Sequence, residues 1–256
     1  MAQRLDYELV RRGLAQSRER AKEYIGRGIV EVNGAAADKP SLSVSENDEI
    51  AINGQTLKYV GRGGLKLEGA LKAFKIDVRG KICLDIGAST GGFTDCLLQS
   101  GASKVYAVDV GHGQLAEKLL NDPRVVSREG VNVKDFTLNM LPERPDFVCA
   151  DLSFISCKYA ASAAAEILAA GCEAVLLIKP QFETGRQHIS KGGIVKDKKV
   201  HAKVIEELCG FFSSLNFEVK GVIPSPIKGG DGNAEYLAYL VKRDSFTPYF
   251  IDANGV

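Results

Sequence analysis

A glycine-rich turn between a buried strand and a helix is the feature that most constrains the fold of this chain. Residues 84–95 read LDIGASTGGFTD, with Asp85 inside the apolar run. Gly87, Gly91 and Gly92 carry no Cβ, so a ligand can approach the backbone closely, and the helix that follows presents free N–H groups to it. The spacing matches neither the G-x-G-x-x-G turn of dinucleotide enzymes nor a P-loop. The turn is typical of a ligand-binding connection, although an ordinary strand-turn-helix unit has the same pattern.

Strands and helices alternate after Leu65, where a first helix begins, and this alternation predicts a doubly wound, mostly parallel sheet. The predicted strands cover residues 81–86, 104–110, 125–127, 146–150, 173–178, 217–223 and 236–241. The further predicted helices cover residues 92–99, 114–120, 158–169 and 198–214. The last two strands have no helix between them, so we expect them to form an antiparallel edge pair.

The composition is that of a globular protein, with 45% hydrophobic and 25% charged residues among 256. A net charge of +1 means that any surface for nucleic acid must be a local patch. None of the six cysteines belongs to a C-x-x-C pair, which predicts reduced thiols in the cytoplasm. We see neither a signal core nor a membrane-spanning run, and we expect no metal site.

A small module precedes the run GRGG at residues 61–64, which is typical of a flexible joint. Helically spaced apolar residues, Ser17 as an N-cap and an alternating strand at residues 29–32 predict an α+β fold for it. We therefore divide the chain into a first domain of residues 1–56, a linker of residues 57–64 and a second domain of residues 65–246.

Basic side chains surround the two helices predicted in this module. They are Arg4, Arg11, Arg12, Arg18, Lys22 and Arg27. Such a face suits contact with phosphates, but Glu8, Glu19 and Glu23 interleave with it, so charge alone fits a solvated surface equally well.

The order of the motifs in this module is more specific than its charge. It runs through Arg4-Leu5-Asp6, Gly13, Ser17-Arg18, Ala21, Ile25, Gly28, Val32-Asn33-Gly34, Lys39-Pro40-Ser41 and Asp48. Over residues 3–53 this order closely resembles the S-four RNA-binding domain. The resemblance implies contact with structured RNA through the helix pair and its basic residues.

Polar residues stand where the predicted strands of the second domain end. Asp109 lies about 20 residues beyond the glycine turn, where a carboxylate accepts the ribose hydroxyls of a bound adenosine or simply caps the strand. Asn132 follows the third strand and Asp151 the fourth. Lys179 follows the fifth strand, an unusual position for a lysine unless it is paired, functional or extended to solvent.

The turn at residues 84–95 resembles the S-adenosylmethionine turn of class I, Rossmann-like methyltransferases, which have a seven-stranded, mostly parallel sheet with an antiparallel last strand. The resemblance implies this cofactor, with Asp85 either meeting the methionine amino group or bracing the loop. The implied cofactor-binding residues are Asp85, Gly87, Ser89, Thr90, Gly91, Gly92, Phe93, Asp109, Asn132 and Asp151. Residues 151–154 read DLSF and lack the two prolines typical of enzymes that methylate base amino groups.

Taken together, five stretches resemble the TlyA family of bacterial rRNA (cytidine-2'-O)-methyltransferases, often called hemolysins. They are residues 61–67, 85–95, 150–156, 178–183 and 232–236. The second domain of that family resembles the FtsJ/RrmJ ribose methyltransferases, which carry a Lys-Asp-Lys-Glu catalytic set. By position the set falls on Lys66, Asp151, Lys179 and Glu235, and ribosomal RNA is the implied partner.

The resemblance implies transfer of a methyl group to a ribose 2'-hydroxyl, which must be oriented and deprotonated. Lys179 is our candidate for this role, either as a neutral base, although the reference pKa of lysine is about 10.4, or as a cation that holds an alkoxide. We expect Asp151 to orient Lys179, Glu235 to position the hydroxyl or a lysine, and Lys66 to fix ribose or phosphate.

Further RNA contacts are predicted in the second domain, at Arg62, Arg186, Lys191, Lys198 and Lys199, with a solvated surface as the alternative. Three other functions remain open. A membrane-active hemolysin predicts a long apolar or amphipathic segment, which we do not find. A non-catalytic assembly factor would have lost its catalytic set, and a small-molecule methyltransferase would have no use for an RNA-binding module.

Overall fold

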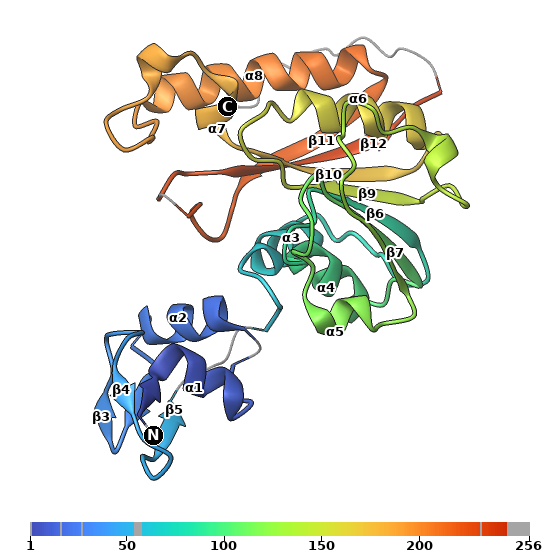
Figure 1. The fold of residues 1–256 in the computed structure, drawn as a ribbon. Coiled ribbons are helices and arrows are strands. Elements are labelled where there is room, and N and C mark those ends of the chain that lie inside the picture. The colour runs from blue at the N-terminus through green and yellow to red at the C-terminus, as the bar shows by residue number, and fades with distance from the viewer. Residues whose placement is uncertain (1, 16, 27, 54–57, 231, 245–256) are drawn as a thin grey trace. The chain divides into compact units, whose positions relative to one another are not determined.

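The computed structural model describes residues 2–15, 17–26, 28–53, 58–230 and 232–244. Within it the chain divides into two compact units, residues 1–58 and residues 59–256 (Figure 1). Each unit has its own hydrophobic core, and we describe each in turn.

The first unit packs two helices against short strands, as the alternating apolar residues predicted. The helices are α1 (Leu5–Arg11) and α2 (Arg18–Gly26), and the strands are β1 (Gln3–Arg4), β2 (Val30–Val32), β3 (Ala35–Ala36), β4 (Ser43–Val44) and β5 (Ile50–Ile52). The antiparallel sheet has the order β3-β2-β5, and β1 pairs with β4. The core contains Leu5 and Leu9 from α1 and Ala21 and Ile25 from α2.

Local signals fix the ends of these elements. The Ser17 hydroxyl accepts a hydrogen bond from the Arg20 amide at 3.2 Å, so Ser17 caps α2 as predicted. Asn33 and Gly34 both have positive φ, 53° and 79°, which gives the tight turn between β2 and β3 the twist that a hairpin needs. The two-residue strands β1, β3 and β4 were not predicted, because two residues carry no periodicity.

The second unit is a seven-stranded sheet in the order β11-β12-β10-β9-β6-β7-β8. The strands are β6 (Ile82–Ile86), β7 (Lys104–Val108), β8 (Val125–Arg128), β9 (Phe147–Ala150), β10 (Glu173–Ile178), β11 (Phe217–Pro224) and β12 (Tyr236–Lys242). β12 lies between β10 and β11 and runs antiparallel to both. The class I fold is therefore confirmed, and so is the antiparallel edge pair, which β11 and β12 form.

Helices cover both faces of this sheet (Figure 1). They are α3 (Gly63–Ala73), α4 (Gly92–Gln99), α5 (Glu117–Leu120), α6 (Lys158–Ile167), α7 (Pro180–Glu183) and α8 (Lys198–Ser214). Alternate residues of each strand serve opposite faces: Leu84 and Ile86 join the core beneath α6 and α8, whereas Cys83 joins the core beneath α3 and α4. This arrangement leaves the loops at the carboxyl edge of the sheet free to build a site.

The segment that we interpreted as a linker packs within the second unit over most of its length. Tyr59 and Val60 are buried in its core, and the Val60 amide donates to Asp95 Oδ2 at 2.8 Å. Helix α3 begins at Gly63 rather than near Leu65. The glycines that suggested a flexible joint instead permit close packing, because a Cβ on Gly64 would overlap the Tyr59 ring.

Candidate active site

The glycine-rich turn has positive φ angles at two of its glycines and at one serine. Gly87 and Gly91 have φ values of 82° and 93°, and Ser89 also has a positive φ, 49°. A Cβ on Gly87 would lie 2.5 Å from the Asp151 carbonyl oxygen, and one on Gly91 would overlap Leu119. Glycine is therefore required at both positions, at Gly87 to let two strand ends approach each other and at Gly91 to seat the turn on α5.

Asp85 lies beneath this turn and is fully buried. It accepts a hydrogen bond from the Thr94 hydroxyl of α4 at 2.7 Å, and burial raises the pKa of its carboxyl group to about 7. Asp85 lines neither of the cavities described below. Of the two roles considered for it, these contacts are those of a residue that braces the turn.

A cavity of about 570 Å³ opens at the carboxyl ends of β6, β7 and β9, a size usual for a small-molecule site. It lies at the point where β6 pairs with β7 on one side and β9 on the other, the switch point at which doubly wound sheets bind ligands. Apolar residues form much of its wall, namely Val108, Val110, Val131, Leu152 and Ile155. Such walls fit a flat aromatic base.

Asp109 supplies the polar part of this cavity. Its Oδ2 accepts from the Ser89 amide at 2.8 Å and its Oδ1 from the Gly111 amide at 2.7 Å. Each carboxylate oxygen has a further lone pair, so these two bonds fix the orientation of the group and leave acceptor capacity for ligand hydroxyls. The carboxylate thus both caps the strand end and lines the cavity.

A second cavity, of about 190 Å³, shares Gly87, Ser89, Asp151 and Ser153 with the first. Lys179 and Arg62 also line it. Two cavities that share a carboxylate, with a lysine in the wall of the smaller one, are suited to hold a donor and an acceptor on either side of a reacting centre. The fit of a nucleoside cofactor in the first cavity rests on this shape, on the Gly87 close approach and on Asp109.

Lys66, Asp151, Lys179 and Glu235 form one connected cluster, in which Asp151 lines both cavities and Lys179 the smaller one, whereas Lys66 and Glu235 line neither. Lys179 Nζ lies 2.6 Å from Asp151 Oδ1, Lys66 Nζ lies 2.7 Å from Glu235 Oε2, and Lys66 Nζ lies 3.4 Å from Asp151 Oδ2. Three of these residues follow or precede a strand at the same edge, because β12 is antiparallel and begins where β10 ends. Lys66 comes from α3, which contacts β12.

Burial makes the charges in this cluster depend on one another. Lys66 and Lys179 are each only 8% exposed and Glu235 is 4% exposed, so each charge depends on its partner. Lys179 Nζ also donates to the Ser153 hydroxyl at 2.8 Å. Asp151 and Ser153 thus occupy two of the three positions around the Lys179 nitrogen, and the third remains for a group in the cavity.

Sequence analysis missed Ser153 and Phe154 as site residues. Phe154 is 88% exposed, lines the larger cavity and has a φ of 67°, rare for a bulky residue. Its ring lies 5.3 Å from that of Phe182. An aromatic residue three positions beyond a strand-end acid is the signal that was available.

The chain belongs to the FtsJ-like methyltransferase family. The family model of the FtsJ-like methyltransferase matches residues 59–242, and that of the S4 domain matches residues 3–50. The 16S/23S rRNA (cytidine-2'-O)-methyltransferase TlyA of Mycobacterium tuberculosis is 44% identical to this chain, over 93% of the chain and 89% of the relative. Hemolysin A of Brachyspira hyodysenteriae is 45% identical, over 93% of this chain and 99% of the relative. A solved structure from Streptococcus thermophilus, named as a hemolysin, is 45% identical with a TM-score of 0.77 and covers 95% of this chain and 90% of that one.

The cofactor residues predicted for this FtsJ-like methyltransferase divide between the two cavities. Gly87, Ser89, Asp109, Asn132 and Asp151 line the larger one, and Thr90, Gly92 and Phe93 line the smaller. Asp85 and Gly91 line neither, and their contacts support the turn instead.

Two buried carboxylates hold the four arginines predicted to bind RNA that the structure describes in the first unit: Arg4, Arg11, Arg12 and Arg18. Asp6 accepts from Arg4 Nε and from Arg18 Nη2, both at 2.9 Å, and these guanidinium groups hold the pKa of Asp6 at about 2. Both arginine side chains remain about half exposed. Buried acids thus fix two cations at the surface.

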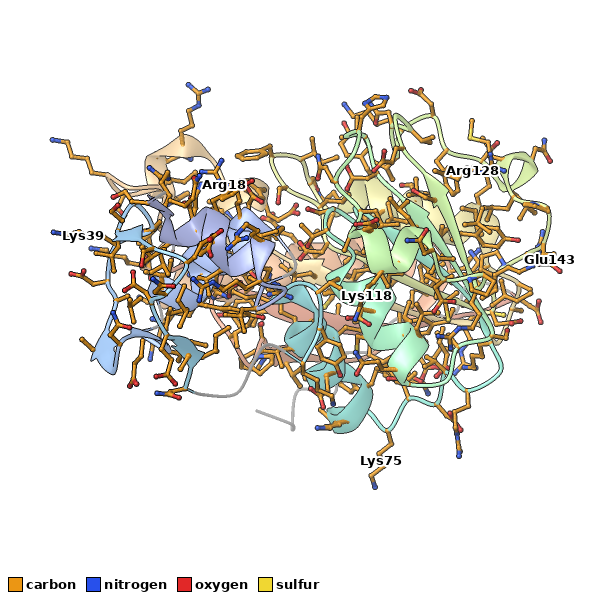
Figure 2. All side chains as sticks on the ribbon, turned by 60° about the horizontal axis from the view of Figure 1, so that its bottom comes forward. Arg18, Lys39, Lys75, Lys118, Arg128 and Glu143 are labelled. Atoms are coloured by element: carbon orange, nitrogen blue, oxygen red, sulfur yellow. The ribbon has the colours of Figure 1, made fainter. Side chains whose placement is uncertain are left out.

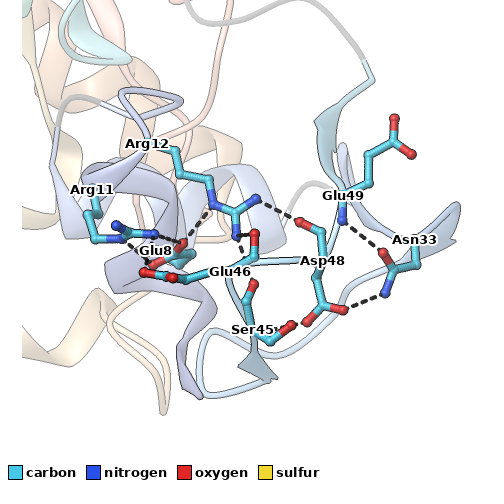
Figure 3. Close-up of polar contacts among 8 residues, drawn as sticks. All are labelled: Glu8, Arg11, Arg12, Asn33, Ser45, Glu46, Asp48 and Glu49. Atoms are coloured by element: carbon cyan, nitrogen blue, oxygen red, sulfur yellow. Dashed lines mark hydrogen bonds and ion pairs between the residues drawn. The ribbon is translucent and has the colours of Figure 1, made fainter. Parts of the chain in front are cut away.

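A second buried carboxylate, Glu8, accepts from Arg11 and Arg12, the last residue of α1 and the residue after it (Figure 3). Arg12 also donates to the backbone carbonyls of Ser45 and Asp48 at 2.8 and 2.7 Å. Its donors are therefore taken up inside the unit, and its contacts are those of a residue that ties α1 to the segment before β5. Lys22 is exposed, and Arg27 lies outside the described residues.

The basic residues predicted in the second unit are exposed. They are Arg62, Arg186, Lys191, Lys198 and Lys199. Arg62 donates to the Lys228 carbonyl at 3.2 Å. The loop before α8 is pinned by buried Asn233, which donates to the Gly193 carbonyl and accepts from the Val195 amide. Charged side chains such as Lys39 and Lys75 extend outward from both units (Figure 2).

Proposed function

We propose that this protein is an S-adenosylmethionine-dependent methyltransferase that modifies the ribose 2'-oxygen of cytidine in bacterial ribosomal RNA. The observation that carries the proposal is the ion-paired cluster of Lys66, Glu235, Lys179 and Asp151. Asp151 lines both cavities and Lys179 lines the smaller one. The relative from M. tuberculosis is named for this reaction on 16S and 23S rRNA.

When bound, S-adenosylmethionine supplies an electrophilic methyl group on a sulfonium sulfur. Asp109 is placed to accept the ribose hydroxyls of the cofactor, and the apolar wall of the larger cavity encloses its base. Gly87 and Ser89 line both cavities and bring backbone to the point where they meet.

Lys179 is the residue that acts on the substrate hydroxyl. Asp151 and Ser153 hold two positions around its nitrogen, and the third serves the ribose 2'-oxygen in either protonation state. A neutral amine accepts the hydroxyl proton there, and an ammonium donates a hydrogen bond to the oxygen as negative charge develops. Lys66, paired with Glu235 and 3.4 Å from Asp151, lines neither cavity, and its proposed contact with ribose or phosphate comes from the family resemblance.

The first unit, which we assign to residues 1–56, binds the RNA through Arg4, Arg11, Arg18 and Lys22. Residues 65–246 carry out the chemistry and add the exposed basic side chains of the loop before α8. Ribosomal subunits are the partner that this combination of an RNA-binding unit and a ribose-methylating unit requires, and the cytoplasm is where they are found.

Two other functions receive less support from the structure. A protein that acts by crossing membranes needs a spanning segment, and no helix among the described residues is long and apolar enough to cross one. A non-catalytic assembly factor would not need three buried charged residues, Lys66, Lys179 and Glu235, clustered on Asp151 beside the cavities, since burying charges costs free energy.

The proposal is tested by incubating the purified protein with radiolabelled S-adenosylmethionine and bacterial ribosomal subunits that lack the modification, followed by mapping of the methyl groups by mass spectrometry. We expect label on the 2'-oxygen of one or two cytidines. Label on a base, or no label despite measurable cofactor binding, would contradict the assignment.

A further inference from the structure

Two segments that carry the candidate active site run beside each other beyond the sheet. One is residues 151–157, which follows β9 and leads into α6, and the other is residues 179–183, which follows β10 and contains α7. β9 and β10 are adjacent parallel strands, so both segments leave the same edge of the sheet.

Contacts join these segments at three levels. Lys179 contacts Asp151 and Ser153 at the first level, and the rings of Phe182 and Phe154 lie 5.3 Å apart at the second. The third level belongs to Glu183, which none of the catalytic steps above uses.

Glu183 uses both of its carboxylate oxygens across the gap between the segments. Oε2 accepts from the Ser156 hydroxyl at 2.6 Å, and Oε1 accepts from the Cys157 amide at 2.7 Å. The Ser156 hydroxyl in turn accepts from the Lys158 amide at 3.1 Å, in the first turn of α6. One side chain therefore fixes the far end of the loop that carries Asp151 and Ser153.

The loop needs such an anchor because its backbone is strained. Phe154 has a φ of 67°, which a large side chain rarely adopts, so local preference does not hold it there. Its ring contact with Phe182 leaves the side chain 88% exposed. The strain is borne by contacts at the two ends of the loop, at Asp151 and at Ser156–Cys157.

We propose that Glu183 is a positioning residue for the methyl transfer: it holds the 151–157 loop in the conformation that sets Asp151 and Ser153 against Lys179 and keeps Phe154 over the larger cavity. This inference rests on the proposed function. Its action is indirect, since Glu183 lines neither cavity.

The alternative is that Glu183 merely caps α6. Its carboxylate does lie at the N-terminus of that helix, where negative charge is stabilising, and Cys157, the N-cap residue, offers no side-chain bond of its own. A cap alone would affect the free energy of unfolding and leave the turnover number unchanged.

The kinetic test compares four variants with the wild-type protein on methyl transfer to ribosomal subunits. Glu183→Ala removes both contacts, Ser156→Ala removes one, and Glu183→Gln keeps an acceptor for the Cys157 amide and a donor for Ser156. Asp146→Ala is the matched control, because Asp146 also accepts from a backbone amide, that of Ile82 at 3.0 Å, but at the opposite end of β9.

We expect Glu183→Ala to lower kcat by about 10- to 100-fold, as a displacement of catalytic groups does, with RNA affinity changed by less than about threefold. Glu183→Gln should retain kcat within about threefold, and Asp146→Ala should retain it while lowering the thermal midpoint comparably. The proposal is overturned if Glu183→Ala lowers kcat no more than Asp146→Ala does. Should Glu183→Ala not fold, Ser156→Ala decides by the same comparison.

A fluorescence measurement tests the same contact without enzymatic activity. The chain contains no tryptophan, so Phe154→Trp places a single reporter on the loop. Adding Glu183→Ala should lower the steady-state anisotropy of this tryptophan, whereas adding Asp146→Ala should not. Equal anisotropies in the two double variants would overturn the inference. If the wild-type protein transfers no methyl group, the proposed function is overturned, but the anisotropy still shows whether Glu183 orders the loop.

Discussion

The two units use ion pairs in opposite ways. In the first unit, Asp6 and Glu8 are buried while their arginine partners Arg4, Arg18 and Arg11 remain about half exposed. In the second unit the lysines themselves are buried, Lys66 beside Glu235 and Lys179 beside Asp151.

This difference indicates different tasks. A buried acid that holds an exposed guanidinium presents a fixed cation to a partner, which suits the phosphates of a large polyanion. A buried lysine at a cavity wall meets only what enters the cavity, where weak screening strengthens its interaction with developing charge. We therefore expect the first set of pairs to act on affinity and the second on rate.

The largest effect is expected from Lys179. Replacing it by alanine removes the group that faces the substrate hydroxyl and should lower the single-turnover rate by about 10²- to 10⁴-fold. Lys81→Ala is the matched control, since Lys81 also pairs with a glutamate, Glu173, but at the far edge of the sheet. A rate in Lys179→Ala within about threefold of that in Lys81→Ala would remove Lys179 from the mechanism.

The next effect is expected from Phe154, which offers an exposed ring at the rim of the larger cavity. Stacking of a base on such a ring contributes on the order of 1–3 kcal/mol, so Phe154→Ala should lower kcat/KM for ribosomal RNA by about tenfold or more. Phe154→Tyr keeps a ring and should retain most of the activity. Equal losses in the two variants would show that the ring is not the feature that matters.

A smaller effect is expected from Arg18→Ala, which removes one exposed cation held by Asp6. Affinity for RNA should fall a few-fold at low salt, and the slope of log affinity against log salt should decrease by about 1. Arg79→Ala provides the control, because Arg79 is likewise paired with a carboxylate, Asp77, but stands before β6 at the opposite end of that strand from the cavities. An unchanged salt slope in Arg18→Ala would contradict the assignment of this surface.

The smallest effect concerns stability and pH. Burial raises the pKa of Asp85 to about 7, above its unfolded value of about 3.9, so the folded state binds this proton more tightly. The contribution of Asp85 to stability is therefore greatest below about pH 4 and is lost as the pH rises towards 7, by at most about 1.4 kcal/mol per pH unit. The side chain in Asp85→Asn does not titrate. Between about pH 4 and pH 7 the free energy of unfolding of this variant, measured by chemical denaturation, should therefore rise relative to that of the wild type. A pH-independent difference would contradict the shift.

The sequence predicted the sheet and its helices well, because their apolar residues alternate or recur at helical spacing. The predicted strand at residues 173–178 and the helices at residues 92–99 and 198–214 coincide with β10, α4 and α8. Helix α5 begins only at Glu117, since the amides of Gly113 and Gln114 are bound by Glu129 instead of entering a helix.

The sequence predicted only those site residues that directly follow a strand of the parallel sheet. Asp109, Asp151 and Lys179 stand at strand ends, so the topology alone brings them to one edge. Lys66 and Glu235 came from the family resemblance. One lies on a helix and the other precedes an antiparallel strand, and the sequence around them does not predict that they lie at this edge.

Contacts made by loops were not predictable. The positive φ of Phe154 and the Glu183 contacts depend on how two loops meet, which no local propensity encodes. The same holds for Glu8, whose spacing from Arg11 and Arg12 suggests pairing, whereas its burial follows only from the packing of α1.

The most direct test of the central claim measures rate and affinity together on two variants. Single-turnover methyl transfer at saturating cofactor and equilibrium RNA binding would be recorded for Lys179→Ala and for the double variant Arg4→Ala/Arg18→Ala. We predict that Lys179→Ala loses the rate and keeps the affinity, while the arginine variant loses affinity and keeps the rate at saturating RNA. The account is contradicted if both variants lose the same quantity.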